Sequence, residues 1–169
     1  MEKFILEIPT IYRENDAINF INEFDDNTII EGDAKLHNHT KKYGSWLLKL
    51  VKNCDLDIPS KTYFLTREND NKIIGITTIN FKQKENYENI KYSISPLEKD
   101  KEYDKTIISL ILKECKNEKI NELIISCDRE NINKAKAIIS LGGKVIKEKF
   151  TKNEYIDLYK ININETLEN

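Results

Sequence analysis

The sequence predicts an α/β fold in which helices pack on a mixed β-sheet. Three observations lead to this prediction. Apolar side chains recur with helical spacing in some segments, alternate or run continuously in others, and turn-forming residues separate the segments. After two leading helices the elements follow the order βββαβαββ, which is typical of an α/β sandwich on a mixed sheet.

The N-terminal part is expected to hold one strand and two helices. Residues 3–8 alternate enough for a strand, and residues 12–25 place their aromatic and aliphatic side chains on one helical face. A second amphipathic helix is marked by the apolar residues at 46–51. The polar stretch 26–40 between the two helices holds both histidines and is typical of a loop.

The remainder alternates between strands and helices. A helix over 103–117 is apolar around much of its circumference, which indicates that it packs on a sheet. A second helix over 131–141 ends at Gly142-Gly143, a sequence typical of a glycine C-cap. Strands are predicted over residues 62–67, 72–81, 90–95, 122–127, 144–150 and 155–163.

Composition limits the classes of function. With 169 residues, the default is one domain over 1–169, and a formal net charge of −2 with interspersed acids and bases gives no basic field for nucleic acid. No apolar run approaches the ~18 residues of a membrane helix, and the N-terminus is too short and acidic for a signal peptide. We expect a soluble, cytoplasmic protein without a membrane partner. The runs of Lys, Asn and Ile are typical of an AT-rich bacterial genome.

The cysteines and histidines favour no metal site. Cys54, Cys115 and Cys127 are odd in number and widely spaced, which favours a reducing cytosol over a disulfide framework. His37 and His39 lie two residues apart, and the sequence contains no CxxC pair. We therefore expect no metal.

Several turn and strand residues occur together in a recognisable order along nearly the whole chain. They are Tyr63-Phe64-Leu65 with Arg67, Asp70-Asn71-Lys72-Ile73-Ile74-Gly75, Tyr92-Ser93-Ile94-Ser95-Pro96 with Glu98, Ile125-Ser126-Cys127-Asp128, Asn131-Ile132, and Ile138 leading into Gly142-Gly143. This pattern resembles the GNAT superfamily of N-acetyltransferases, in particular a branch of small bacterial enzymes. The resemblance implies a mixed, mostly antiparallel, twisted sheet flanked by helices on both faces.

The resemblance also implies a reaction. A GNAT enzyme transfers the acetyl group of acetyl-CoA directly to an amine, here the amine of a small molecule, and needs no covalent enzyme intermediate. It implies that the strand ending at Ile94 pairs with the pantetheine arm and that Asn131 contacts pantetheine or the adjacent backbone. The pyrophosphate would lie against the amides of Lys99, Asp100, Lys101, Glu102, Tyr103 and Asp104.

The predicted pyrophosphate loop departs from the family pattern, Arg/Gln-x-x-Gly-x-Gly/Ala. Lys99, Glu102 and Asp104 occupy the three defined places, so the loop has no glycine. Residues 98–105 carry three lysines and four acids, a balance of −1. A carboxylate ~5 Å from a diphosphate costs on the order of 1–3 kcal/mol, or about tenfold to a hundredfold in affinity. An alternative is that this run is a solvated helix start with weak local salt bridges.

Three residues are candidates for catalysis, each with a structural alternative. Cys127 ends a strand near the expected thioester, although a buried cysteine usually acts as a small hydrophobe. Asp128 is a candidate proton acceptor or a helix cap. Tyr92 faces either the substrate or the core. No tyrosine follows Asn131 in its helix, where many relatives place the general acid.

The loop at 26–40 offers further candidates. His37 or His39 would serve as a base near neutral pH, or both are solvated. Glu31 and Asp33 would hold a cationic amine.

Two hypotheses of different class follow. The first is an acetyltransferase that uses acetyl-CoA. The alternative is a catalytically degenerate GNAT domain that binds no CoA and serves as a binding or regulatory module. A homodimer formed through edge strands is compatible with either hypothesis.

Overall fold

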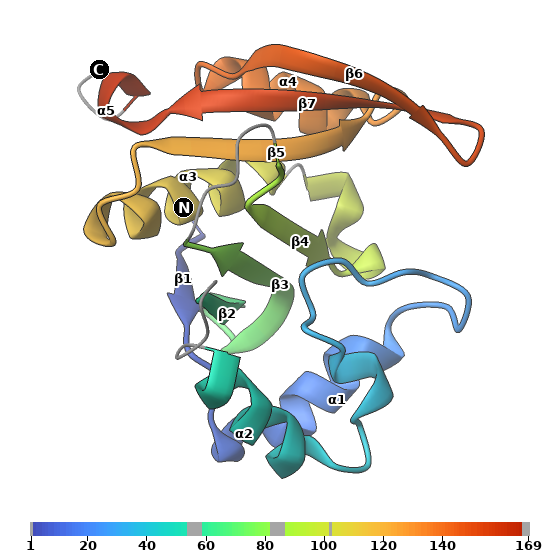
Figure 1. Ribbon diagram of the computed structural model, residues 1–169. Helices are drawn as coiled ribbons and strands as arrows, with labels where there is room; N and C mark the ends of the chain where they lie inside the picture. Colours follow the sequence, from blue (N-terminus) through green and yellow to red (C-terminus); the bar gives the residue numbers. More distant parts are fainter. Residues whose placement is uncertain (1, 54–58, 82–86, 102, 167–169) are drawn as a thin grey trace. The chain divides into compact units, whose positions relative to one another are not determined.

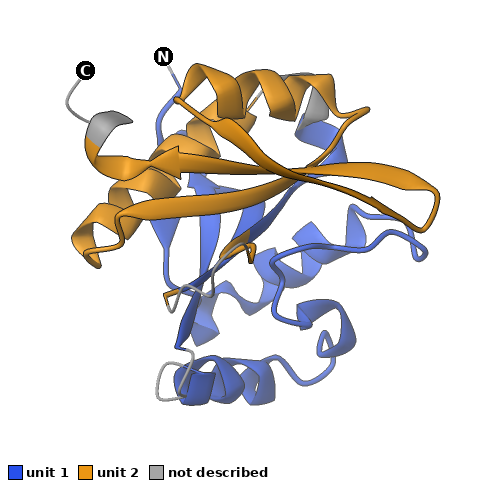
Figure 2. Ribbon diagram, turned by 45° about the horizontal axis from the view of Figure 1, so that its top comes forward, with its two compact units in different colours: residues 1–80, 91–101 blue, residues 81–90, 102–169 orange. Residues whose placement is uncertain are grey.

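The computed structural model describes residues 2–53, 59–81, 87–101 and 103–166. The chain's contacts divide it into two compact units, which Figure 2 colours separately. Unit 1 comprises residues 1–80 and 91–101, and unit 2 comprises residues 81–90 and 102–169. The expectation of one domain over 1–169 stays a prediction.

Seven strands form a mixed, mostly antiparallel sheet in the order β1-β2-β3-β4-β5-β7-β6 (Figure 1). The one parallel pairing described joins β4 and β5 at Ile90 and Ile125. The predicted fold class is confirmed. The strands are β1 (Phe4–Glu7), β2 (Ser60–Arg67), β3 (Lys72–Asn80), β4 (Ile90–Ile94), β5 (Glu122–Asp128), β6 (Lys144–Thr151) and β7 (Glu154–Asn162).

The helices also follow the predicted order. They are α1 (Glu14–Asn22), α2 (Tyr43–Asn53), α3 (Asp104–Asn117), α4 (Ile132–Ser140) and α5 (Ile163–Thr166), with 3-10 turns η1 (Ile11–Arg13), η2 (Leu36–Asn38) and η3 (Pro96–Lys101). The first helix is shorter than the predicted 12–25, because Glu23 and Phe24 donate to carbonyls three residues back and tighten its end. Neither α5 nor the 3-10 turns were predicted from the sequence.

In unit 1, α1 packs on β3 and α2 on β2. Trp46 of α2 is fully buried and stacks on Phe64 of β2, with ring centroids 6.1 Å apart. Phe20 of α1 and Leu36 of η2 belong to the same core. Burial of these large apolar groups is the main favourable contribution to the free energy of packing the two helices on the strands.

The segment 26–40, predicted as a loop, is fixed in place. The hydroxyl of Thr78 donates to the Gly32 carbonyl at 2.8 Å, and Trp46 Nε1 donates to the Ala34 carbonyl at 3.1 Å. Gly32 has a φ of +78°, and a Cβ added there would lie 2.3 Å from the Lys91 carbonyl oxygen. Only glycine allows the loop backbone to lie this close to β4.

In unit 2, α4 ends in the predicted glycine cap. Gly142 has a φ of +83°, and the Gly143 amide donates to the Ile138 carbonyl at 3.0 Å. The outer strand β6 is exposed at every residue except the partly buried Ile146. Its lysines, Lys144, Lys147 and Lys149, are of the kind that protects an edge strand from pairing. The homodimer stays a prediction.

No helix in the described part of the chain has the length and apolar character that crossing a membrane requires.

The fit of Gly32 against β4 gives the first prediction. Gly32→Ala should lower the free energy of unfolding by about 2–4 kcal/mol, since it adds both a backbone collision and a strained positive φ. Gly44→Ala in α2 is the matched control, because the added Cβ meets nothing nearer than 4.0 Å. The control should raise stability by up to about 1 kcal/mol. Urea denaturation measures both, and equal effects would contradict the assignment.

Candidate functional site

The predicted site residues are distributed over both compact units, and each group is described in its own unit. Unit 1 holds Tyr92, Ile94, Lys99, Asp100 and Lys101. Unit 2 holds Tyr103, Asp104, Cys127, Asp128 and Asn131. Glu102, the most consequential departure from the GNAT loop pattern, lies outside the described residues, and for Lys99, Asp100 and Lys101 only the backbone is described.

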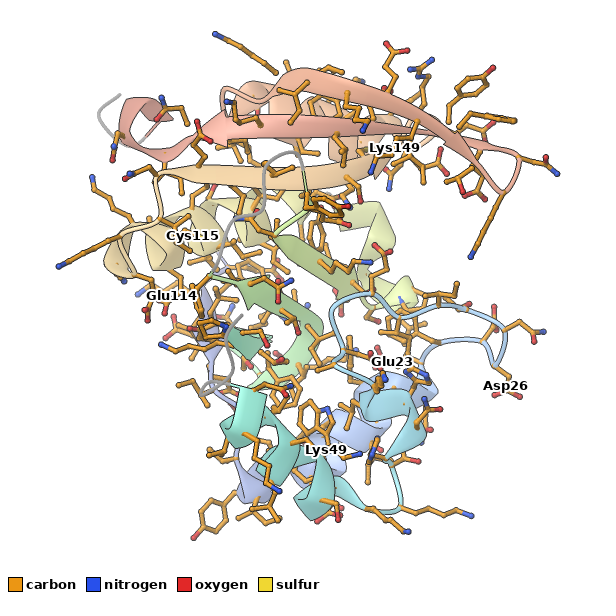
Figure 3. All side chains as sticks on the ribbon, in the orientation of Figure 1. Glu23, Asp26, Lys49, Glu114, Cys115 and Lys149 are labelled. Carbon is orange, nitrogen blue, oxygen red and sulfur yellow. The ribbon has the colours of Figure 1, made fainter. Side chains whose placement is uncertain are left out.

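In unit 1, the segment that begins the predicted pyrophosphate loop is anchored by a buried ion network. Glu98 of η3 is 4% exposed and accepts from Arg67 Nη1 at 3.0 Å, while Lys72 Nζ lies 3.5 Å from its other oxygen. Lys72 also pairs with Glu23 at 3.0 Å, and Glu23 in turn accepts from the hydroxyl of Ser95 (Glu23 is labelled in Figure 3). Glu98 is thus connected through Lys72 and Glu23 to Ser95, the residue directly before η3.

Arg67 also holds the hairpin turn of β2 and β3. Its Nε and Nη2 donate to the two oxygens of Asp70 at 3.0 and 2.7 Å. These hydrogen bonds lower the pKa of Asp70 to about 2, with the Arg67 side chain as the largest cause. The carboxylate therefore stays ionised, and the guanidinium that also holds Glu98 keeps a fixed orientation.

This network changes the electrostatics expected of residues 98–105. The alternative of a solvated run fails at Glu98, which is buried with two cationic partners. The rest of the run then carries three lysines and three acids, so its balance is neutral instead of −1.

In unit 2, α3 begins without a side-chain cap. Its N-cap residue, Tyr103, is 7% exposed and adopts a helical φ and ψ, and its side chain does not cap the helix. The first-turn amides of an α-helix have no partners within the helix, and its dipole places partial positive charge there. Asp104 adds a carboxylate to the same turn.

A hollow of about 240 Å³ opens beside this helix start. It is lined by Asp104, Lys105, Asn133, Lys136, Ala137 and Ser140. The lining from α4 recurs at intervals of three, four and seven residues, so it forms one helical face. Lys105 and Lys136 supply two cations against the one carboxylate of Asp104, which suits an anionic ligand.

Two predicted site residues, Asp128 and Asn131, have structural roles in the turn between β5 and α4. Asp128 accepts from the Glu130 amide at 2.9 Å, and the Asn131 side chain accepts from the Lys134 amide at 3.1 Å. Asn131, and not Asp128, is therefore the side chain that caps α4. Asp128 shapes the turn that presents Asn131 at the exposed start of the helix.

Cys127 is a neutral, buried thiol. It is 2% exposed and donates to the carbonyls of Asp128 and Asn131 at 3.3 and 3.6 Å. Burial, the largest cause, raises the pKa of Cys127 to about 11, although Lys134 works in the opposite direction. The reactive thiolate is scarce at neutral pH, which favours the structural alternative for this residue.

On β4, Tyr92 is 6% exposed and Ile94 is partly buried. Burial leaves both alternatives for Tyr92 open, since a core side chain and one lining a covered site are equally enclosed. The backbone role expected of Ile94 stays a prediction.

No group of three or more His, Cys, Asp or Glu side chains within the described ranges is arranged to hold a metal ion.

Comparisons with known proteins identify the fold. The sequence matches no protein-family model and no curated protein. The structure is similar to a ribosomal-protein-S5-alanine acetyltransferase from Vibrio fischeri, with a TM-score of 0.73 at 16% identity over 98% of this chain and 96% of that one. It is also similar to the microcin C7 self-immunity acetyltransferase MccE, solved with acetyl-CoA and AMP. The TM-score is 0.71 at 14% identity over 95% of this chain and 92% of that one. A GNAT-family acetyltransferase from Bacillus anthracis matches over 97% and 99% of the two chains, with a TM-score of 0.62 at 13% identity.

The chain has the GNAT acetyltransferase fold.

Within the GNAT fold, the α4 side of the hollow was not predicted from the sequence. Lys136 and Ser140 were not singled out, although the spacing of Asn133, Lys136, Ala137 and Ser140 is the helical signal that would have grouped them. It also missed the buried pairing of Arg67 with Glu98, since the sequence gives no sign of a contact between residues 31 positions apart.

The ion network gives the second prediction. Arg67→Met should lower the free energy of unfolding by about 2–4 kcal/mol, because it leaves the buried Glu98 short of its main partner. The double variant Arg67→Met/Glu98→Leu should recover part of this loss. Lys160→Met is the matched control, since its pair with Glu122 is half exposed and is expected to be worth less than about 1 kcal/mol. Urea denaturation of the four proteins tests this, and an Arg67→Met loss no larger than the control would refute it.

The third prediction concerns Cys127. Its raised pKa should slow alkylation by iodoacetamide at pH 7.5 by about 100-fold relative to the unfolded chain. The folded pKa lies above the unfolded value of 9.0, so the associated stability is present below pH 9 and is lost as the pH rises through about 11. Peptide mass spectrometry measures the labelling, with the buried Cys115 as the internal control. Fast labelling of Cys127 alone would instead indicate an activated thiol.

Proposed function

We propose that this protein is an acetyltransferase that transfers the acetyl group of acetyl-CoA to the amine of a small molecule in the cytoplasm. The observation that carries the proposal is the hollow at the uncapped start of α3, with two lysines at its rim. The GNAT fold supports it, because the similar structures are acetyltransferases and one of them was solved with acetyl-CoA. Fold alone licenses only the reaction class.

The residues present fit the anionic part of acetyl-CoA. The amides of the first α3 turn, from Tyr103 onward, and the ammonium groups of Lys105 and Lys136 are donors suited to phosphate oxygens. Asn131 keeps its side-chain NH₂ for a ligand, since capping uses only its oxygen. Asp104 opposes the anion. The backbone contacts expected of Lys99, Asp100, Lys101 and Glu102 stay predictions.

The chemistry requires no enzyme nucleophile. A neutral amine attacks the thioester carbonyl, the carbon–nitrogen bond forms, and the carbon–sulfur bond breaks as CoA leaves. The neutral state of Cys127 agrees with this direct transfer. The roles of Tyr92 and Asp128 in proton transfer stay candidates within the proposal.

The alternative is a GNAT domain that has lost CoA binding and acts as a binding or regulatory module. The carboxylate of Asp104 in the lining of the hollow favours it. The double variant Glu102→Gly/Asp104→Ala separates the two hypotheses. Binding of CoA that appears only in this variant would refute the enzyme proposal.

Calorimetric titration of the native chain gives the fourth prediction. We expect acetyl-CoA and CoA to bind with micromolar affinity that weakens from low to physiological salt, because the contacts are largely ionic. Lys105→Ala and Lys136→Ala should each weaken binding by roughly three- to tenfold. Lys113→Ala, also on α3 but outside the hollow, is the charge-matched control and should change nothing.

An absence of binding at millimolar acetyl-CoA would refute the proposal and favour the regulatory alternative. If acetyl-CoA binds, release of free CoA thiol in the presence of spermidine, tyramine and other amines then identifies the acceptor class.

A further inference from the structure

The loop between α1 and α2 is built around a buried carboxylate. The side chain of Asp33 is 6% exposed and accepts from the Lys35 amide at 2.8 Å through one oxygen. Its other oxygen accepts from the His37 amide at 3.0 Å. These hydrogen bonds fix the orientation of the carboxylate and satisfy its charge within the loop.

The same carboxylate orients an imidazole. His37 Nδ1 lies 2.5 Å from Asp33 Oδ2, and because a carboxylate only accepts, Nδ1 must carry the hydrogen. In the neutral ring the basic lone pair is therefore on Nε2. The His37 side chain is 45% exposed, and its Nε2 has no hydrogen-bond partner among the residues that the structure describes.

His39 provides the contrast within the same loop. Its Nδ1 donates to the Lys35 carbonyl at 2.9 Å, and its Nε2 accepts from Lys49 Nζ at 2.7 Å (Lys49 is labelled in Figure 3). Both nitrogens of His39 are thus used, whereas His37 keeps one for a ligand.

The loop that carries Asp33 and His37 includes two residues with strained backbone conformations. Ala34 and Lys35 adopt φ values of +49° and +69°, a region that costs a non-glycine residue on the order of 1–2 kcal/mol. Trp46, Thr78 and the buried Leu36 hold them there. Such strain persists where the surrounding structure determines it, and it is concentrated at functional loops.

The loop also lies against β4, the strand expected to bind pantetheine. A Cβ at Gly32 would lie 3.0 Å from the Tyr92 Cα, and Glu31 pairs with Lys91 at 3.8 Å. The loop at 26–40 carries the charged residues Asp26, Glu31, Asp33 and Lys35. Lys49 of α2 contacts it at His39, and Lys91 of β4 contacts it at Glu31.

We infer that His37 is the general base of the acetyl transfer, with Asp33 as its positioning residue, and that the acceptor is an alkylamine that arrives as an ammonium ion. The inference rests on the proposed function. Nε2 of His37 takes one proton from the ammonium, and Asp33 stabilises the resulting imidazolium. The neutral nitrogen then attacks the thioester, and its second proton goes to the departing CoA thiolate. His37 afterwards returns its proton to water.

The first experiment tests the hydrogen bond between Asp33 and His37 and does not require enzyme activity. The chain has two histidines, so long-range ¹H–¹⁵N NMR spectra of the native protein and of His39→Gln assign both rings. At pH 8 we expect the neutral His37 ring to carry its proton on Nδ1, and Asp33→Asn to give a mixture of tautomers. A proton on Nε2 of His37 in the native chain would overturn the inference.

The second experiment, which gives the fifth prediction, compares two amines. Spermidine and tyramine are protonated at pH 7, whereas hydroxylamine is already neutral. His37→Gln should lower kcat/KM for the better alkylamine by about 10²–10³-fold, and that for hydroxylamine by less than about threefold. Asp33→Asn should show the same selectivity with a smaller loss and an altered pH profile of kcat/KM. His39→Gln is the matched control and should behave as the native chain does.

The outcomes separate the inference from the proposed function. Native turnover that His37→Gln leaves intact, or lowers equally for both amines, overturns the base assignment while the acetyltransferase proposal stands. A native chain that neither binds nor consumes acetyl-CoA refutes the proposed function, and the base assignment fails with it.

Discussion

The buried carboxylate of Glu98 is the constraint on which the start of η3 and the hairpin of β2 and β3 depend. An ionised carboxylate at 4% exposure is unfavourable unless cations and hydrogen bonds compensate for its lost hydration. Arg67 and Lys72 supply that compensation from the hairpin of β2 and β3, and Glu23 and Ser95 complete the ring. These contacts fix the start of η3 by charge pairing and hydrogen bonds.

A second buried carboxylate organises the loop at 26–40 in a different way. Asp33 satisfies its charge with backbone amides and an imidazole, and no arginine or lysine side chain of the described residues pairs with it. Because the donors come from the loop itself, the carboxylate determines the loop's shape as well as the orientation of His37. Because amides of the loop itself donate to this carboxylate, its burial does not require charged partners from the rest of the core. Such a carboxylate can therefore orient a reactive side chain within a loop.

In unit 2, three predicted site residues make structural contacts. Cys127 is neutral and enclosed, and Asp128 and Asn131 are engaged in the turn and cap that begin α4. The groups suited to bind an anion are the uncapped first turn of α3 and the two lysines at the hollow. The affinity of such residues for an anion would depend strongly on ionic strength, since Lys105 and Lys136 are exposed.

The sequence by itself determined the element order, the glycine cap of α4 and the family resemblance, because periodicity and turn chemistry are local properties that each segment carries alone. It also identified both histidines, but it could not distinguish them. Only the tertiary structure decided that His37 contacts a buried carboxylate while His39 is fully bonded, that Glu98 is buried, and that Lys136 lines the hollow beside α3. These properties depend on contacts between residues or elements brought together by folding, and burial, charge pairing and hydrogen bonding have no period in a sequence.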